Sequence, residues 1–148
     1  MKLSTRGRYG ARAMLDLALH YQEGTVLLKD IAVRQGLSRR YLGNIMATLV
    51  CSGLVKSTRG QKGGVTLAKP PREIRLSQVI EAVEGSIAPV LCVDNPQMCE
   101  RAATCVTRDI WKRLKEVIWE ELDSITLEDM VRMQREKMKD QKTPIYHI

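Results

Sequence analysis

Three of the four cysteines lie within one short stretch, LCVDNPQMCERAATC, which covers residues 91–105. Thiolates are soft, anionic ligands, and they bind iron–sulfur clusters well. The spacing C-x6-C-x5-C differs from the C-x2-C pairs that are typical of ferredoxins and zinc ribbons. The candidate metal ligands are therefore Cys92, Cys99 and Cys105. The alternative is a group of free, half-buried thiols without metal.

The residues around these cysteines favour a loop that leads into a helix. Asn95 and Pro96 are typical of a loop that can fold around a cluster. Cys105 precedes a long helical pattern, and the dipole at a helix N-terminus lowers the pKa of a thiol. Three thiolates leave one coordination position, for which the chain itself offers Asp94, Glu100 and Asp109. A residue of a partner chain or a small molecule could also fill this position, or it could stay open. The fourth cysteine, Cys51, is expected to be a small core residue.

The net charge of +7 is unevenly spread along the 148 residues. Residues 1–70 carry 12 Lys and Arg against 3 Asp and Glu (+9), whereas residues 71–148 carry 12 against 14 (−2). A basic half joined to a slightly acidic half indicates a module that binds a polyanion, with a second module attached. The alternative is an ordinary solvated basic surface.

Several classes of protein are disfavoured by what the sequence lacks. No apolar run is long enough to span a bilayer, and the N-terminus has no apolar signal segment. We therefore expect a soluble, cytoplasmic protein with no membrane partner, in a compartment where clustered cysteines bind metal or react as thiols rather than forming disulfides. No nucleotide loop and no nucleophile–base pair can be identified, so an enzyme is not expected.

The basic half has the pattern of a helix-turn-helix followed by a wing. A first helix is predicted after a cap at Ser4 or Thr5, a second over 28–35, and a third over 39–51 after a cap at Ser38, with Gly36 supplying the turn. Two short strands follow, joined by the glycine-rich RGQKGG. The predicted fold is mainly α with a small β-hairpin wing, a winged helix-turn-helix domain followed by a long dimerisation helix.

This pattern assigns candidate DNA-binding residues. The N-terminal end of the third helix enters the major groove in this motif, where Arg can read guanine or phosphate and Asn can read adenine. The tip of a wing can lie in a minor groove or along the backbone. The candidates are Ser38, Arg39, Arg40, Tyr41, Asn44, Arg59, Gly60, Lys62 and Gly63.

The second half is expected to connect and to dimerise. Residues 1–70 form the DNA-binding domain, 71–105 a connecting helix and the cysteine loop, 106–136 the dimerisation helix and a final helix, and 137–148 a disordered tail. The long helix is predicted over 106–125, and Thr126 is expected to cap the final helix. The long helix carries an apolar stripe that its own chain has little left to cover, so a homodimer is expected, with Trp111 and Trp119 as packing anchors. Packing within one chain is the alternative. A two-fold dimer predicts a palindromic operator on double-stranded DNA.

Several segments together resemble the iron–sulfur cluster regulator family (IscR/NsrR/RirA type) of dimeric winged-helix transcription factors. The resemblance covers about residues 1–133 and rests on MKLSTRGRYGARAMLDLA, LKDIAVRQGLSRRYL, the wing STRGQKGGVTLAK, LSQVIEAVEG, the cysteine triplet and ITLEDMV. It implies a homodimer whose long helix crosses its partner. It also implies a cluster held by the three cysteines, whose state changes the affinity for DNA.

The chain departs from that family pattern at three positions. Arg108 stands where one branch has a His three residues after the last cysteine, and Arg8 aligns with an Asp that can complete the cluster in another branch. The resemblance therefore supplies no fourth ligand, which favours [4Fe–4S] over [2Fe–2S]. Gly43 replaces an acidic residue that discriminates between DNA sites.

The sequence thus predicts a DNA-binding transcriptional regulator, a repressor, whose operator affinity is controlled by an iron–sulfur cluster that senses iron, redox or nitric oxide status. The first alternative is a cluster-free winged-helix regulator that senses thiol oxidation, a metabolite or a partner enzyme. A small iron–sulfur redox protein is the second alternative.

Overall fold

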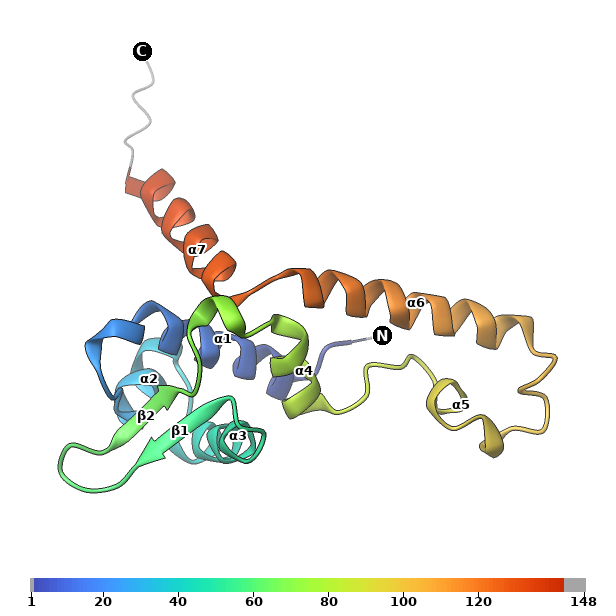
Figure 1. Ribbon diagram of the computed structural model, residues 1–148, viewed down its shortest axis with the longest axis horizontal. Helices are drawn as coiled ribbons and strands as arrows, with labels where there is room; N and C mark the ends of the chain where they lie inside the picture. Colours follow the sequence, from blue (N-terminus) through green and yellow to red (C-terminus); the bar gives the residue numbers. More distant parts are fainter. Residues whose placement is uncertain (1, 143–148) are drawn as a thin grey trace, which may run out of the picture.

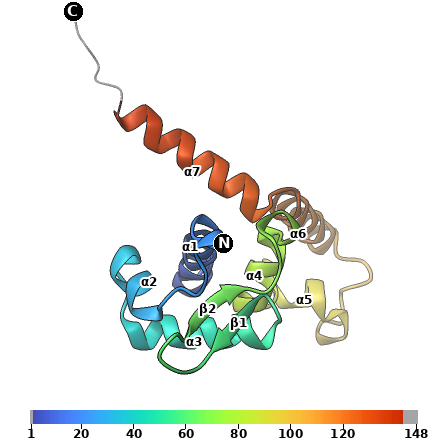
Figure 2. The same ribbon diagram turned by 60° about the vertical axis from the view of Figure 1, so that its left-hand side comes forward.

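The structure, a computed structural model, describes residues 2–142 and is mainly helical with one two-stranded hairpin (Figures 1 and 2). The elements in chain order are α1 (Thr5–Leu19), α2 (Leu28–Gln35), α3 (Arg39–Cys51), β1 (Val55–Thr58), β2 (Gly64–Leu67), α4 (Leu76–Glu84), α5 (Leu91–Asp94), α6 (Val106–Ser124) and α7 (Leu127–Lys142). The first four helices and the hairpin form a compact body, from which α6 and α7 extend in two directions (Figure 1). The expected fold class, mainly α with a small β-hairpin wing, is confirmed.

The helix-turn-helix forms because its polar caps match the helix ends. The Ser4 hydroxyl accepts a hydrogen bond from the Gly7 N–H, and the Ser38 hydroxyl accepts one from the Tyr41 N–H, both at 3.1 Å. Each cap satisfies a backbone donor that the first helical turn leaves unpaired. Gly36 ends α2 in the left-handed conformation, with φ 63°, so the chain can turn into α3.

The wing is an antiparallel pair that runs from Val55 opposite Leu67 to Thr58 opposite Gly64. Val26 extends it by exchanging two backbone hydrogen bonds of 2.9 Å with Val65. Gly63 closes the tip, since a Cβ there would lie 2.5 Å from the Thr58 carbonyl oxygen. The base of the wing is thus held to the body while its tip projects.

One hydrophobic core joins the helix-turn-helix to the elements that follow it. The side chains of Met14, Ile31, Leu42, Val79 and Leu127 come from five different helices and are all fully buried. In contrast, α6 has no buried residue. The expected division of the chain at residues 70, 105 and 136 remains a prediction.

Two glycines let α4 approach α1 closely. A Cβ at Gly10 would lie 3.2 Å from both methyl groups of Val83, and one at Gly7 would meet the carboxylate of Glu84. The helix that leads into the cysteine segment is therefore packed directly on the first helix of the helix-turn-helix.

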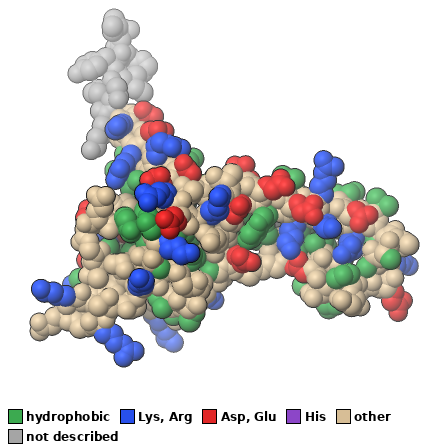
Figure 3. All heavy atoms as spheres, in the orientation of Figure 1, with side chains coloured by type: hydrophobic (Ala, Val, Ile, Leu, Met, Phe, Trp, Pro, Cys, Tyr) green, Lys and Arg blue, Asp and Glu red, His purple; other side chains and the backbone are tan. Residues whose placement is uncertain are grey.

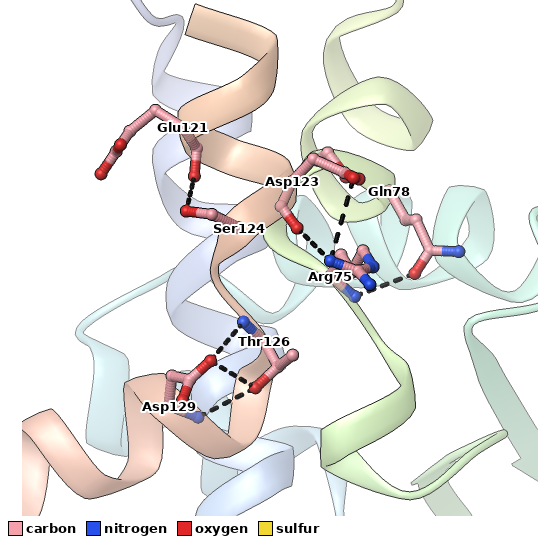
Figure 4. Close-up of polar contacts among 8 residues, drawn as sticks. Arg75, Gln78, Glu121, Asp123, Ser124, Thr126 and Asp129 are labelled. Carbon is pink, nitrogen blue, oxygen red and sulfur yellow. Dashed lines mark hydrogen bonds and ion pairs between the residues drawn. The ribbon is translucent and has the colours of Figure 1, made fainter.

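A polar and backbone junction fixes α6 and α7 to the start of α4 (Figure 4). The Leu76 N–H donates to the Ile125 carbonyl at 2.8 Å, and the Leu127 N–H donates to the Ile74 carbonyl at 2.9 Å. The Arg75 guanidinium donates to the Asp123 carbonyl. The buried Ser77 hydroxyl also donates to the Asp123 carboxylate, at 2.5 Å.

A reciprocal cap begins α7, as the predicted Thr126 cap requires. The Asp129 N–H donates to the Thr126 hydroxyl at 3.1 Å, and the Asp129 carboxylate accepts from the Thr126 N–H at 2.9 Å (Figure 4). These backbone and side-chain hydrogen bonds lower the pKa of Asp129. The carboxylate also complements the positive end of the helix dipole.

Three details differ from the expectation. The long helix ends at Ser124 because Ile125 is extended and pairs with Leu76. The last helix continues beyond residue 136 to Lys142, and residues 143–148 of the expected tail lie outside the described part. Cys51 is exposed, not a core residue, because it falls on the outer side of the last turn of α3.

Candidate DNA-binding surface and cysteine site

The predicted recognition residues of α3 lie on its exposed side. Ser38, Arg39, Arg40 and Asn44 are all exposed, while the next turns bury their apolar residues in the core. The Ser38 hydroxyl already caps the helix. Figure 3 shows Lys and Arg side chains projecting at the lower left of the molecule, around the place where Figure 1 draws the wing. The arrangement can present cations and an amide to a nucleic acid.

Tyr41 lies between this surface and the core. Its half-buried ring meets the ring of Tyr9 edge to face, with centroids 6.0 Å apart. The guanidinium groups of Arg8 and Arg12 lie 5.9 and 5.4 Å from the centre of the Tyr9 ring. Cation–π attraction thus holds these two cations beside a ring that also contacts α3.

Arg6 is a basic residue near α3 that the sequence reasoning missed. Its guanidinium donates to the Thr48 hydroxyl, and that hydroxyl donates to the Asn44 carbonyl at 3.2 Å. Arg6 therefore lies on the same side of the molecule as the exposed Asn44. The basic first turn, TRGR, is the sequence signal that could have drawn attention to it.

The wing residues divide into two roles. Arg59, Gly60 and Lys62 are exposed at the tip. Gly63 is buried, and its N–H donates to the Gly60 carbonyl at 3.0 Å, so it shapes the turn from within. The Lys62 carbonyl accepts from the Thr25 hydroxyl at 3.1 Å, which links the tip to the segment before α2.

The three clustered cysteines come from different parts of the α4–α6 connection. Cys92 lies on α5, Cys99 follows the 3-10 turn Pro96–Met98, and Cys105 is the N-terminal cap residue of α6. The connection was expected to be a loop, and it contains these two short helical turns. All three thiols are free and half-buried. Within residues 2–142, no three Cys, His, Asp or Glu side chains form a group that could hold a single metal ion.

Cys105 has the most favourable surroundings for a thiolate. A hydrogen bond with the Thr107 hydroxyl, 3.2 Å away, and further ones from the Arg108 and Thr107 backbone lower the pKa of its thiol. A lowered pKa increases the thiolate fraction near neutral pH, and the thiolate is both the metal ligand and the nucleophile.

Two cations on α6 hold α5. The Arg108 Nε donates to the Cys92 carbonyl at 2.8 Å, and the Lys115 ammonium donates to the Asp94 carboxylate at 2.5 Å. Hydrogen bonds from Lys115 and Ser86 lower the pKa of Asp94. The first cysteine is thus attached to the helix that begins at the third cysteine.

The outer side of α6 is apolar and uncovered in the single chain. Val106, Ile110 and Val117 are 70%, 54% and 54% exposed, and Trp111 is exposed as well. Trp119 faces the other way, into a cleft of about 720 Å³ between α4, α5 and α6. An apolar helix side of this kind is typical of a surface that packs against another protein.

The comparisons with known proteins identify the family. A family model described as "Rrf2: Iron-dependent Transcriptional regulator" matches residues 3–133. The chain belongs to the Rrf2 family. No helix in residues 2–142 is both long and apolar enough to cross a bilayer.

Similar Rrf2 proteins share both sequence and structure with the chain. The HTH-type transcriptional regulator IscR of Pectobacterium atrosepticum is 42% identical over 88% of this chain and 79% of its own length. The structure of T. potens IscR is 42% identical, with a TM-score of 0.75 over 97% of this chain and 93% of the other. The structure of CymR, described as the global cysteine regulator of B. subtilis, is 39% identical, with a TM-score of 0.74 over 90% and 98%. The chain is accordingly a transcriptional regulator with a DNA-binding winged helix, not an enzyme, and the expected family resemblance is confirmed.

Proposed function

We propose that this Rrf2 regulator is a homodimeric repressor whose operator affinity is controlled by an iron–sulfur cluster bound by Cys92, Cys99 and Cys105. One observation carries the proposal. Three free cysteines lie on the connection between α4, which packs on the DNA-binding helices, and α6, which has the uncovered apolar side.

The donor set fits a cluster. Thiolate sulfurs are the usual ligands of iron–sulfur centres. In a [4Fe–4S] cluster each cysteine would bind a different iron, and in a [2Fe–2S] cluster two of them would share one, so the three thiols need not converge on a single ion. The similarity to two IscR proteins supports this ligand set. A bound cluster would supply an iron centre that reacts with oxidants and nitric oxide, and both [4Fe–4S] and [2Fe–2S] remain candidates for three cysteines.

A dimer is supported by the apolar side of α6. Val106, Ile110 and Val117 would become buried when this helix packs against a second copy. The two recognition helices would then be related by a two-fold axis. The operator would be a palindrome, with half-sites about one or two turns of DNA apart.

The DNA contacts follow from the exposed basic residues. Arg39, Arg40 and Asn44 would read or anchor the major groove, and Arg59 and Lys62 would contact the minor groove or the backbone. Tyr41, which packs on Tyr9, would offer only its hydroxyl. Gly60 and Gly63 would shape the wing tip.

Communication between the cysteines and DNA would pass through α4. Because α4 packs closely on α1 at Gly10, a shift of α4 would be transmitted to α1. Only about 1.4 kcal/mol of difference in DNA binding between the two states gives a tenfold change in operator affinity. A small rearrangement of the connection is therefore sufficient for regulation.

The second candidate is a cluster-free regulator that senses thiol oxidation. It is favoured by the lowered pKa of the Cys105 thiol and by the similarity to the global cysteine regulator of B. subtilis. In that case the thiols themselves would be the sensor, and the protein would need no iron.

Anaerobic purification of the full chain, with iron, sulfide and a visible spectrum measured per monomer, tests the first candidate against the second. We expect a coloured protein with bound iron and sulfide. Its affinity for a palindromic operator should change when the cluster is removed, and changing all three cysteines to alanine should abolish that change. A colourless protein that also fails to take up a cluster on reconstitution would contradict the proposal and favour the thiol sensor.

A further inference from the structure

Arg108 joins the first and third cysteines of the connection. Its Nε donates to the Cys92 carbonyl at 2.8 Å in a half-buried setting, and Arg108 itself lies in the first turn of α6, three residues after Cys105. A contact between the guanidinium and a backbone carbonyl constrains the segment that carries Cys92 rather than the thiol itself. The thiol of Cys92 is thus left available for another partner.

The rest of α5 is held from the same helix. The Lys115 ammonium, two turns further along α6, bonds to the Asp94 carboxylate, and the Ser86 hydroxyl bonds to the same carboxylate. Lys115 therefore fixes the end of α5, and Arg108 fixes the turn that contains the cysteine. Cys99 has no comparable attachment to α6 among residues 2–142.

The chemistry of arginine limits what Arg108 can do at a metal site. A guanidinium keeps its positive charge and offers only N–H donors, so it has no free lone pair with which to bind iron. Deprotonated cysteines make the site anionic, and a nearby cation stabilises such a charge. A structural role and an electrostatic role are both open to this side chain, whereas ligation is not.

We propose that Arg108 is a positioning residue of the cysteine site, which holds the Cys92 segment against α6 and supplies positive charge rather than a ligand. This inference rests on the proposed cluster for its electrostatic part only. The positioning part concerns the metal-free chain and can be measured there.

Alkylation of the metal-free full chain under reducing, anaerobic conditions tests the positioning. In Arg108→Gln we expect Cys92 to react faster with iodoacetamide, on the order of tenfold, because one charge-assisted hydrogen bond no longer opposes local opening. The matched control is Arg101→Gln, which removes the same charge from the cysteine segment but alters no side-chain hydrogen bond within residues 2–142. Exposed Cys51 on α3 is the internal reference, and its rate should not change. An unchanged Cys92 rate in Arg108→Gln, or an equal increase in Arg101→Gln, would overturn the positioning role.

Cluster binding by Arg108 variants tests whether the side chain supplies positive charge to the cluster. We expect Arg108→Gln to take up the same number of irons per monomer as the unchanged chain, but to lose them several times faster to a chelator. Arg108→His should add a nitrogen signal to the pulsed EPR spectrum of the reduced cluster, because imidazole can ligate iron. If Arg108→Gln lost iron no faster than the unchanged chain, the electrostatic part of this inference would be refuted. If the unchanged chain takes up no iron and sulfide at all, the proposed function fails, and the alkylation result still decides the positioning role.

Discussion

At the scale of single residues, the buried carboxylate of Asp16 ties α1 to α2. It is 2% exposed and accepts hydrogen bonds from Arg34 at 2.7 and 2.9 Å and from Gln35 at 3.0 Å. Burial by itself would raise the pKa of Asp16, but the hydrogen bonds from these two residues and the charge of Arg34 outweigh it, and the pKa is lowered. The ionised form is therefore the one that stabilises the folded chain.

We predict that Asp16→Asn lowers the free energy of unfolding by about 2 kcal/mol at pH 7, because it leaves a guanidinium without its charged partner. Because folding lowers the pKa of Asp16, its ionised carboxylate stabilises the folded chain fully above the unfolded-state pKa of about 3.8. This stabilisation is lost as the pH falls through the folded-state pKa. Urea unfolding should thus show a difference between the two proteins that shrinks in acid. Asp30→Asn, which removes a carboxylate from α2 without a side-chain hydrogen bond, is the control. Equal losses for both variants would contradict the prediction.

Two exposed residues, Asn44 and Lys62, allow sequence recognition to be measured separately from electrostatic attraction to DNA. Asn44→Ala should reduce the preference for the operator over a mutated site by about 1–3 kcal/mol, because an amide that can read adenine is lost. Lys62→Ala should weaken binding to all sequences equally and reduce the slope of log affinity against log salt by about 1. Fluorescence anisotropy over a salt series measures both effects. Arg72→Ala, on the turn next to α7, should change neither.

At the scale of elements, the packing of α1 on α4 can be tested with paired glycines. In Gly10→Ala the new methyl would lie 3.2 Å from both Val83 methyl groups. Val83 cannot easily relieve this contact by rotating, because χ1 of valine is restricted. We expect a loss of about 1 kcal/mol or more in the free energy of unfolding.

Gly43→Ala is the matched change on α3, where the new methyl would meet a Leu28 carbon at an ordinary 3.8 Å. It should stabilise the protein by about 0.5–1 kcal/mol, because alanine is the better helix former. Thermal unfolding compares the two. Stabilisation by Gly10→Ala to the same degree would show that the approach of α1 and α4 is not tight.

At the scale of the whole molecule, the outer side of α6 should be a dimer interface. We predict that Ile110→Glu gives a monomer, because a charge would be buried in an apolar contact. The same variant should bind a full palindrome no better than a half-site. Analytical ultracentrifugation and operator titration measure these outcomes. Glu116→Gln, which faces the cleft beside α4 and α5, should remain dimeric. A dimeric Ile110→Glu would place the interface elsewhere.

Local signals account for most of what the sequence predicted correctly. The caps Ser4, Ser38 and Thr126 and the turn at Gly36 have short-range causes, and all four are present as expected. The helix-turn-helix, the wing and the long helix follow from such signals and from apolar spacing. The exposed Arg39, Arg40 and Asn44 follow from the same spacing.

The features that were missed depend on contacts between distant segments. The end of α6 at Ser124 is set by pairing with Leu76, and the approach of Arg6 to α3 requires the packing of α1. The contact of Arg108 with the Cys92 carbonyl joins α6 to α5, and no spacing along the chain indicates it. The exposure of Cys51 is different, because it could have been predicted: Cys51 comes two residues after the buried Leu49 and so lies on the opposite side of α3.

The backbone pairing of residues 74–76 with residues 125–127 gives the molecule a mechanical pivot. These hydrogen bonds join main-chain atoms, so they do not depend on which side chains these residues carry. The start of α4 and the end of α6 meet at this pairing, and the cysteine connection joins their other ends. If the cysteine connection shortened, the angle between α4 and α6 would close. The end of α6 that lies far from the backbone pairing would then move furthest. A small contraction near the cysteines would thus become a large sweep of α6.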